Sequence, residues 1–122
     1  MMKYVYHKSD AETVVKHKHG VDITVYAKPG VLLPNVVYEE TEIGHLQEWY
    51  SDKSTQTWYI IEGEGVFVLD GEKFKVGAGD LVAVPPKVKK YYYGKMKMVL
   101  VTSPGYDPDD EHKVRTISEE EL

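Results

Sequence analysis

Four polar residues near turn-forming segments are the part of this sequence best suited to chemistry. Tyr50, Asp52 and Gln56 follow one another at short intervals, and Lys90 lies in a later segment that has similar turn residues on both sides. A phenol, a carboxylate and an ammonium group can transfer protons, and together with an amide they can hold an anionic or sugar-like molecule. The same set suits a metal poorly, because a protonated lysine cannot ligate a cation and repels it. If the fold brings them together, these residues suit a small-molecule ligand better than a metal ion.

Aromatic residues accompany these positions. The chain has 10 tyrosines, and Trp58 and Tyr92 lie two residues after Gln56 and Lys90. Residues two apart on a strand point to the same side, so each of these pairs shares a face. Aromatic walls with a few polar groups are typical of small-molecule pockets. Ordinary packing within a sheet, which also favours Trp and Tyr, is the alternative explanation.

Short strands separated by turn signals must position these residues. The segments predicted as strands are 21–27, 57–61, 65–69, 73–76, 81–84, 90–93 and 96–102. Asp70-Gly71 predicts a tight hairpin between two of them, and Glu62-Gly63-Glu64 predicts a turn between two others. Helix is expected only as one turn within 11–16 and as a turn capped by Ser118. Many short strands with closely spaced turns indicate an all-β sandwich or barrel.

The pattern of turns and spacings resembles the two sequence motifs of the cupin superfamily. The first spacing is Gly44-x5-Tyr50-x-Asp52-x3-Gln56-x6-Gly63, and the second is Gly79-x5-Pro85-x-Lys87-x2-Lys90-x3-Gly94. The segments 58–65, 70–72, 77–82 and 103–110 are also similar to small single-domain cupins. The resemblance covers about residues 36–112 and implies a double-stranded β-helix, or jelly-roll, barrel. We therefore predict one cupin domain over residues 1–122, with 1–20 and 105–122 peripheral.

The resemblance also locates the metal site of metal-dependent cupins, which three histidines and a glutamate form. In this chain those positions fall on Tyr50, Asp52, Gln56 and Lys90. If the motif is read one residue earlier, Trp49 and Ser51 replace the first two. The distance from Gly44 favours the first reading and local similarity the second, and a slip of one residue exchanges which pair points into the barrel. Both sets lack the family's ligands, so we predict neither a metal nor another cofactor there.

Composition limits the functional classes. The chain has 122 residues, a net charge of −5 and no cysteine, which leaves no thiolate chemistry and argues against nucleic acid or an anionic membrane as the main partner. No apolar run approaches the ~20 residues of a membrane span, and no signal segment opens the chain, so a cytoplasmic location is expected. Few amides beside many Lys and Glu residues are typical of thermophiles.

Open strand edges and the outward-facing Tyr59, Ile61, Tyr91 and Tyr93 predict a homodimer.

Three functions fit these features. The first is binding of a small anionic or carbohydrate-like molecule in a metal-free pocket, with Lys90 as its electrostatic anchor. The second is a metal-independent sugar isomerase, epimerase or lyase of the cupin kind, in which Tyr50, Asp52 or Lys90 would serve as acid or base. The third is a metal-dependent oxygenase or isomerase with unusual ligands, such as His45 and Glu48. The pocket predicted for the first function consists of Tyr50, Asp52, Gln56, Trp58, Lys90 and Tyr92.

Overall fold

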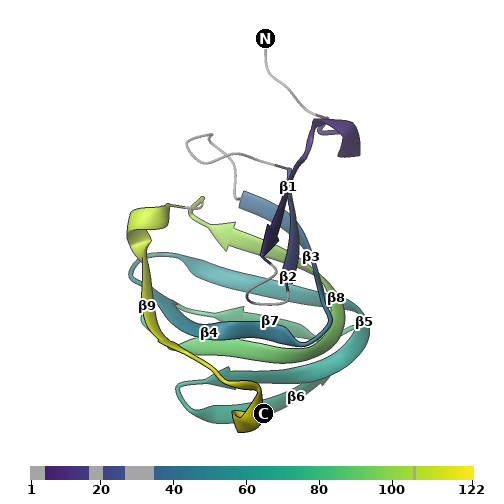
Figure 1. Ribbon diagram of the computed structural model, residues 1–122. Coiled ribbons are helices and arrows are strands. Elements are labelled where there is room, and N and C mark those ends of the chain that lie inside the picture. Colours follow the sequence, from purple (N-terminus) through teal and green to yellow (C-terminus); the bar gives the residue numbers. More distant parts are fainter. Residues whose placement is uncertain (1–4, 17–20, 27–34, 106) are drawn as a thin grey trace.

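The computed structural model describes residues 5–16, 21–26, 35–105 and 107–122, which form one antiparallel sheet curled into a jelly-roll barrel (Figure 1). Nine strands make up this sheet within the described residues. They are β1 Glu12–Lys16, β2 Val21–Val25, β3 Asn35–Thr41, β4 Gly44–Ser51, β5 Thr55–Leu69, β6 Glu72–Gly77, β7 Leu81–Val84, β8 Lys90–Ser103 and β9 Glu111–Thr116. Short 3-10 turns cover Lys8–Asp10, Pro108–Asp110 and Glu119–Glu121. The predicted all-β barrel is confirmed.

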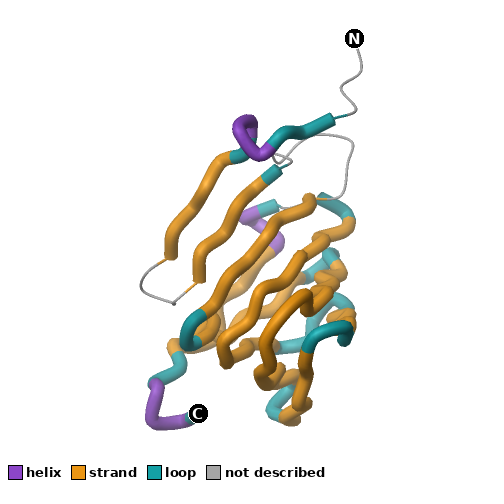
Figure 2. The backbone as a smooth tube through the Cα atoms, turned by 90° about the vertical axis from the view of Figure 1, so that its right-hand side faces the viewer, coloured by secondary structure: helices purple, strands orange, loops and turns teal. Residues whose placement is uncertain are grey.

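Two long strands, β5 and β8, form the frame of the barrel. They pair along almost their whole length, from Thr55 opposite Ser103 to Leu69 opposite Lys90. Because both strands are long and bent, their two halves reach different neighbours. The two ends of β8 pair with β4 and β3, while the two ends of β5 pair with β7 and β6. The resulting ribbon curves around the molecule, and β1 and β2 extend the sheet beyond β3 (Figure 2).

Glycines let this ribbon bend where the sequence predicted turns. Gly63 has a φ of 92° and Gly94 a φ of 121°. A Cβ on Gly63 would lie 2.1 Å from the carbonyl oxygen of Lys95, and one on Gly94 would lie 2.6 Å from that of Glu64, so only glycine fits at either position. The prediction of a turn at 62–64 is therefore wrong. Residues 62–64 instead continue β5 and pair with β8, directly after a bulge at Ile61 where the pairing register shifts.

Other local predictions have mixed outcomes. Asp70 and Gly71 both have positive φ, at 48° and 82°, and form the predicted hairpin between β5 and β6. Ser118 caps the final turn through a capping box with Glu121, as predicted. The prediction of a helical turn within 11–16 is wrong, because this segment forms β1 and pairs with β2. Pairing between strands outweighs the weak local preference for helix there.

The main core fills the inside of the roll, where Trp58, Ile60, Phe67 and Met98 are fully buried. A second, smaller cluster lies elsewhere and consists of Leu46, Val68, Tyr91 and Ile117. Because Ile117 comes from the end of the chain, the C-terminal segment covers this second cluster.

The two pairs of residues predicted to face outward behave differently. Tyr59 and Ile61 are exposed, at 47% and 46%. Tyr91 is only 5% exposed, and Tyr93 is partly buried beside it. The prediction that Tyr91 and Tyr93 lie on an open outer face is therefore wrong, since Ile117 and Leu46 pack there.

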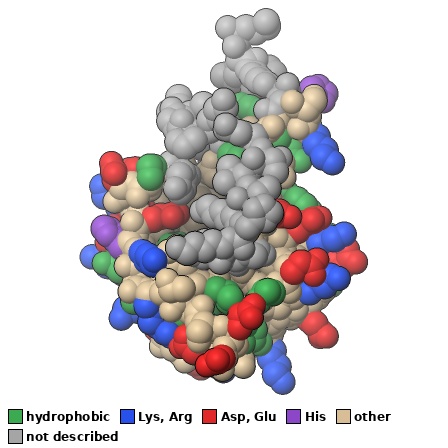
Figure 3. Space-filling model, viewed as in Figure 1, with side chains coloured by type: hydrophobic (Ala, Val, Ile, Leu, Met, Phe, Trp, Pro, Cys, Tyr) green, Lys and Arg blue, Asp and Glu red, His purple; other side chains and the backbone are tan. Residues whose placement is uncertain are grey.

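Charged groups are distributed around the surface. Figure 3 shows acidic and basic side chains interspersed on one face of the molecule. Within the described part of the chain, no helix has the length and apolar character needed to cross a membrane.

Candidate functional site

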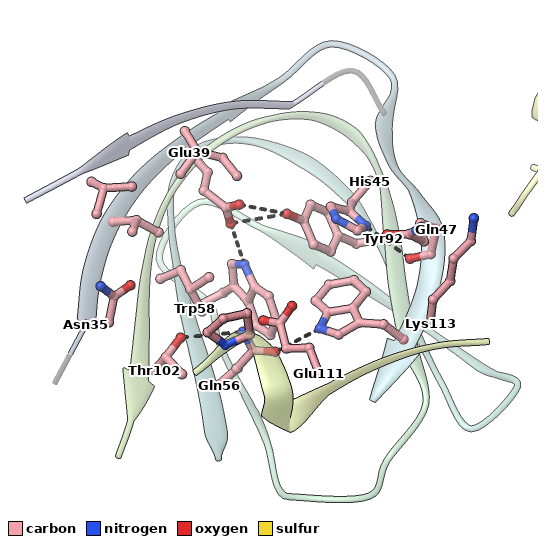
Figure 4. A pocket seen from close by; sticks show the side chains of 16 residues that line it. Asn35, Glu39, His45, Gln47, Gln56, Trp58, Tyr92, Thr102, Glu111 and Lys113 are labelled. Atoms are coloured by element: carbon pink, nitrogen blue, oxygen red, sulfur yellow. Dashed lines mark hydrogen bonds between the residues drawn. The ribbon is translucent and has the colours of Figure 1, made fainter. Parts of the chain in front are cut away.

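A cavity of about 480 Å³ lies inside the barrel, a size that suits a small molecule (Figure 4). Side chains from β2, β3, β4, β5 and β8 line it, and the C-terminal segment closes one side. Its lining combines aromatic and aliphatic groups with carboxylates, amides and one imidazole. The structure therefore supports the small-molecule pocket that the aromatic residues predicted.

The register of β3, β8 and β5 arranges part of this lining in three rows. Residues directly opposite one another on the three strands make one row, and successive rows are two residues apart. The amide row is Asn35, Thr102 and Gln56; the apolar row is Val37, Leu100 and Trp58; the acidic row contains Glu39. The cavity is thus polar at two levels and apolar between them.

Glu39 is a buried carboxylate held by two donors. It is 2% exposed, and one of its oxygens accepts a hydrogen bond of 2.7 Å from Nε1 of Trp58. The hydroxyl of Tyr92 lies 3.1 Å from both carboxylate oxygens. Burial, followed by the charge of Glu39, raises the pKa of the Tyr92 phenol well above its usual value. Tyr92 is therefore protonated at neutral pH and can act as a hydrogen-bond donor.

His45 is the imidazole of the cavity. It lies opposite Tyr92 in the pairing of β4 with β8, and the two ring centroids are 5.6 Å apart. Its Nδ1 is 3.0 Å from the carbonyl oxygen of Gln47. Because a carbonyl oxygen only accepts, Nδ1 carries the hydrogen in this bond and Nε2 carries the lone pair of the neutral ring. His45 thus has the tautomer of a base whose reactive nitrogen is Nε2.

The predicted pocket residues divide into two groups. Gln56, Trp58 and Tyr92 line the cavity. Tyr50 and Asp52 instead lie against His112: the Tyr50 ring stacks on it at 5.0 Å, and Oδ2 of Asp52 is 2.6 Å from its Nε2.

The reading of the first motif that favoured Tyr50 and Asp52 inside is wrong. Trp49 lines the cavity and Ser51 is buried, so β4 follows the earlier register. The pairing of β4 with both of its neighbours, β8 and β9, is irregular just before Trp49, so the distance from Gly44 does not reveal which residues point inward.

Lys90 lies neither in the cavity lining nor in solvent. Its side chain is 1% exposed, and its ammonium group packs on the ring of Trp49 at 4.7 Å from the centroid. Burial lowers the pKa of Lys90 to about 8, against the opposing charges of Glu111 and Asp110. The structure therefore places Lys90 behind an aromatic residue of the site.

The side chains at the family's metal positions do not fit a metal ion. In the observed register they are Trp49, Ser51, Gln56 and Lys90. An indole and a lysine ammonium do not ligate the metals that imidazole and carboxylate hold. His45 and Glu48 do not form a substitute pair, because Glu48 accepts a hydrogen bond from Arg115 and is not part of the cavity lining. Among the described residues, no three His, Cys, Asp or Glu side chains are grouped to hold a metal.

The C-terminal segment, predicted to be peripheral, is part of the site. Pro108, Glu111 and Lys113 line the cavity. The segment is fastened by Asp110, whose carboxylate accepts hydrogen bonds from the backbone N–H groups of Lys53 at 2.8 Å and Ser54 at 3.1 Å. The sequence motifs stop short of this segment, which is why its role was not predicted.

Three other cavity residues were not predicted for the pocket. His45 was considered only as a metal ligand with Glu48, and Glu39 was not considered, although each alternates with inward-facing neighbours on its strand. Thr102 gave no signal, because nothing in the sequence distinguishes it from an ordinary strand residue.

Comparison with known proteins agrees with this architecture. Residues 37–102 match the family model described as the cupin domain, and the chain belongs to this family. A curated protein of Methanocaldococcus jannaschii, the uncharacterized protein MJ1618, is 34% identical over 61 residues; the match covers 47% of this chain and 49% of that protein. The chain thus spans about half the length of this curated relative.

Solved structures give a more detailed likeness. Pac13 from Streptomyces, described as a nucleoside dehydratase, is 40–41% identical with a TM-score of 0.91, and the match covers 98–99% of this chain and 98% of Pac13. Its structures with uridine include one variant with a histidine changed to glutamine and two with a tyrosine changed to phenylalanine. KdgF from Halomonas, at 15% identity and a TM-score of 0.71 over 87% of this chain and 97% of KdgF, shares the fold.

Proposed function

We propose that this protein is a metal-independent nucleoside dehydratase, which removes water from the sugar of a nucleoside inside the barrel. The observation that carries the proposal is the pairing of His45 with Tyr92 in the cavity of a chain so similar to Pac13 along its whole length. The Pac13 variants solved with uridine change a histidine or a tyrosine. His45 is the histidine, and Tyr92 the tyrosine, among the described residues that line this cavity.

We assign His45 the role of general base, which its place in the cavity and its Nδ1 hydrogen bond support. Its Nε2 takes a proton from a sugar carbon, the electrons of the C–H bond form a double bond to the neighbouring carbon, and the C–O bond there breaks. The hydroxyl group leaves as water after receiving the proton back from the His45 imidazolium, so the reaction consumes no other reagent. Tyr92, which stays protonated, gives its one hydrogen to Glu39, so its phenol oxygen can accept a hydrogen bond from a sugar hydroxyl and help to position the sugar beside His45.

This chemistry restricts the substrate. An imidazole removes a proton from carbon only when an adjacent carbonyl stabilises the negative charge that develops. The substrate we propose is therefore a nucleoside whose sugar has been oxidised to an aldehyde or ketone. Two carboxylates, those of Glu39 and Glu111, line the cavity with Lys113. This balance favours an uncharged nucleoside over the anionic ligand predicted from the sequence.

The test is turnover of oxidised nucleosides by the purified protein, followed by mass spectrometry for loss of one water. We expect conversion by the native protein and at least about 100-fold slower conversion by His45→Gln, because general base catalysis contributes that much or more. His7→Gln, which changes an exposed histidine, is the matched control and should be fully active. Tight binding of nucleosides without any conversion would support the simpler function of a binding protein instead.

We also propose that the protein acts as a homodimer. Tyr59, Ile61 and Leu81 are all exposed large apolar residues, and Tyr59 pairs directly with Leu81 between β5 and β7. A second copy of the chain would cover this surface. Light scattering at micromolar concentration should give twice the 13.9 kDa of one chain. Tyr59→Lys should halve the mass, and a monomeric native protein would contradict the proposal.

A further inference from the structure

The amide row is a built polar surface at one level of the cavity. Asn35, Thr102 and Gln56 are 7%, 3% and 3% exposed, and they lie side by side on three neighbouring strands (Figure 4). Burying such groups is costly unless they form hydrogen bonds. Their position in the wall of the cavity, next to the apolar row, makes them available to a ligand.

The orientation of the Gln56 amide is fixed by Trp49. The indole N–H of Trp49 lies 3.2 Å from Oε1 of Gln56, and because an indole only donates, this atom must be the amide oxygen. The amide nitrogen Nε2 then faces Oγ1 of Thr102, at 3.4 Å, and donates to it. This bond uses one of the two Nε2 hydrogens. Thr102 accepts through its oxygen and so keeps its own hydroxyl hydrogen for donation. Together Gln56 and Thr102 offer two hydrogen-bond donors.

The spacing of the rows shows which part of a ligand these donors reach. Asn35 and Glu39 are four residues apart on β3, which places the amide row about 13 Å from the acidic row. The apolar row with Trp58 lies between them. The proposed function, on which this step rests, puts the sugar beside His45 and Tyr92. The planar base of a nucleoside then lies along the apolar row, and the edge of the base farthest from the sugar meets the amide row.

We propose that Gln56 and Thr102 are specificity-determining residues that read a carbonyl oxygen on the far edge of the base, so that the protein prefers uracil nucleosides to cytosine nucleosides. At this edge a uracil-type base has a carbonyl acceptor, whereas cytosine has an amino donor. The donors of Gln56 and Thr102 pair with the carbonyl. Facing the amino group, they would remain buried and unpaired.

The experiment is calorimetric titration of the intact protein with uridine and with cytidine. We expect uridine to bind about tenfold more tightly, the effect of one unpaired buried donor. Thr102→Val keeps the shape and removes the hydroxyl. Uridine then loses a hydrogen-bond partner and cytidine no longer faces an unpaired donor at this residue, so the preference for uridine should fall about tenfold. Trp49→Phe removes the N–H that orients Gln56 and should also reduce the preference. Thr57→Val is the matched control, because Thr57 lies one residue from Gln56 on the same strand and outside the cavity lining.

The results separate this inference from the proposed function. His45→Gln should slow turnover at least about 100-fold and keep the preference for uridine. Preference without turnover by the native protein would contradict the dehydratase and leave the role of Gln56 and Thr102 intact. Equal affinity for the two nucleosides, no binding of either, or a preference that Thr102→Val leaves undiminished would overturn the inference even if the protein converts oxidised nucleosides.

Discussion

The ammonium group of Lys90 lies 4.7 Å from the centroid of the Trp49 ring, and Trp49 belongs to the cavity wall while Lys90 does not. Contacts of this kind contribute about 2 kcal/mol when they are shielded from water. Trp49 in turn packs on His45, with ring centroids 4.3 Å apart, and donates to Gln56. Lys90 therefore supports Trp49, which contacts both His45, the proposed general base, and Gln56 of the amide row.

Lys90 should give the protein a characteristic dependence of stability on pH. Its pKa falls from 10.5 to about 8 on folding, so between these values the unfolded chain binds the proton more tightly. The free energy of unfolding should then rise as the pH increases from about 8 to 10, by up to about 3 kcal/mol. Lys90→Met should lack this rise, measured by urea unfolding across that range. Parallel pH profiles for the two proteins would show that Lys90 keeps an ordinary pKa.

Glu39→Gln should destabilise the protein by about 1–3 kcal/mol, because a neutral amide oxygen accepts weaker hydrogen bonds from Trp58 and Tyr92 than the buried carboxylate does. Urea unfolding at neutral pH measures the loss. Glu40→Gln is the control: the next residue on β3 is exposed, and its change should cost less than about 0.5 kcal/mol. Equal effects of the two substitutions would mean that the buried bonds of Glu39 contribute little.

Asp110→Asn should loosen the C-terminal segment. Burial alone would raise the pKa of Asp110, but its hydrogen bonds from Ser54 and Lys53 outweigh burial and lower it. The stabilisation is therefore present above the unfolded pKa of about 3.9 and is lost as the pH falls through the lower folded value. Hydrogen exchange at the amides of Lys53 and Ser54 should speed up in the variant at neutral pH.

Asp109→Asn provides the comparison for this experiment, because Asp109 is exposed and its carboxylate does not bond those amides. Exchange at Lys53 and Ser54 should be unchanged in it. If Asp109→Asn had the same effect as Asp110→Asn, net charge rather than the two hydrogen bonds would hold the segment.

The purified protein should contain no stoichiometric zinc, iron, manganese or nickel. The reason is the donor set at the family's metal positions, where Trp49 and Lys90 replace imidazoles. Elemental analysis after dialysis tests this expectation. About one metal per chain, retained through dialysis, would contradict it and revive the metal-dependent alternative.

The fold could be predicted from the sequence because its turn chemistry is strongly specified. Asp70-Gly71 has the positive φ values that a tight hairpin requires, and the motif glycines resemble the family's pattern. The same glycines misled the prediction of strand ends. Gly63 and Gly94 serve equally well in a turn or in a bent continuous strand, and only the pairing of β5 with β8 distinguishes the two.

The site was less predictable because it depends on which face of a strand points inward. Gln56, Trp58 and Tyr92 lie on regular stretches, and alternation placed them correctly in the cavity. On β4 the pairing is irregular near Trp49, so the sequence did not determine which alternate residues face the cavity. The preferred reading of the motif placed Tyr50 and Asp52 inside, where the structure has Trp49. The contribution of the C-terminal segment is long-range and has no local sequence signal.

The C-terminal segment that lines the cavity extends the part of this chain needed to form the site beyond the family motifs. The family match ends at residue 102, and a truncation made at that boundary would keep both sequence motifs. It would nevertheless remove Glu111 and Lys113 from the cavity wall. It would also remove Asp110, whose carboxylate accepts hydrogen bonds from the backbone N–H groups of Lys53 and Ser54. The segment that follows the family motifs therefore supplies cavity side chains that the barrel strands alone do not provide.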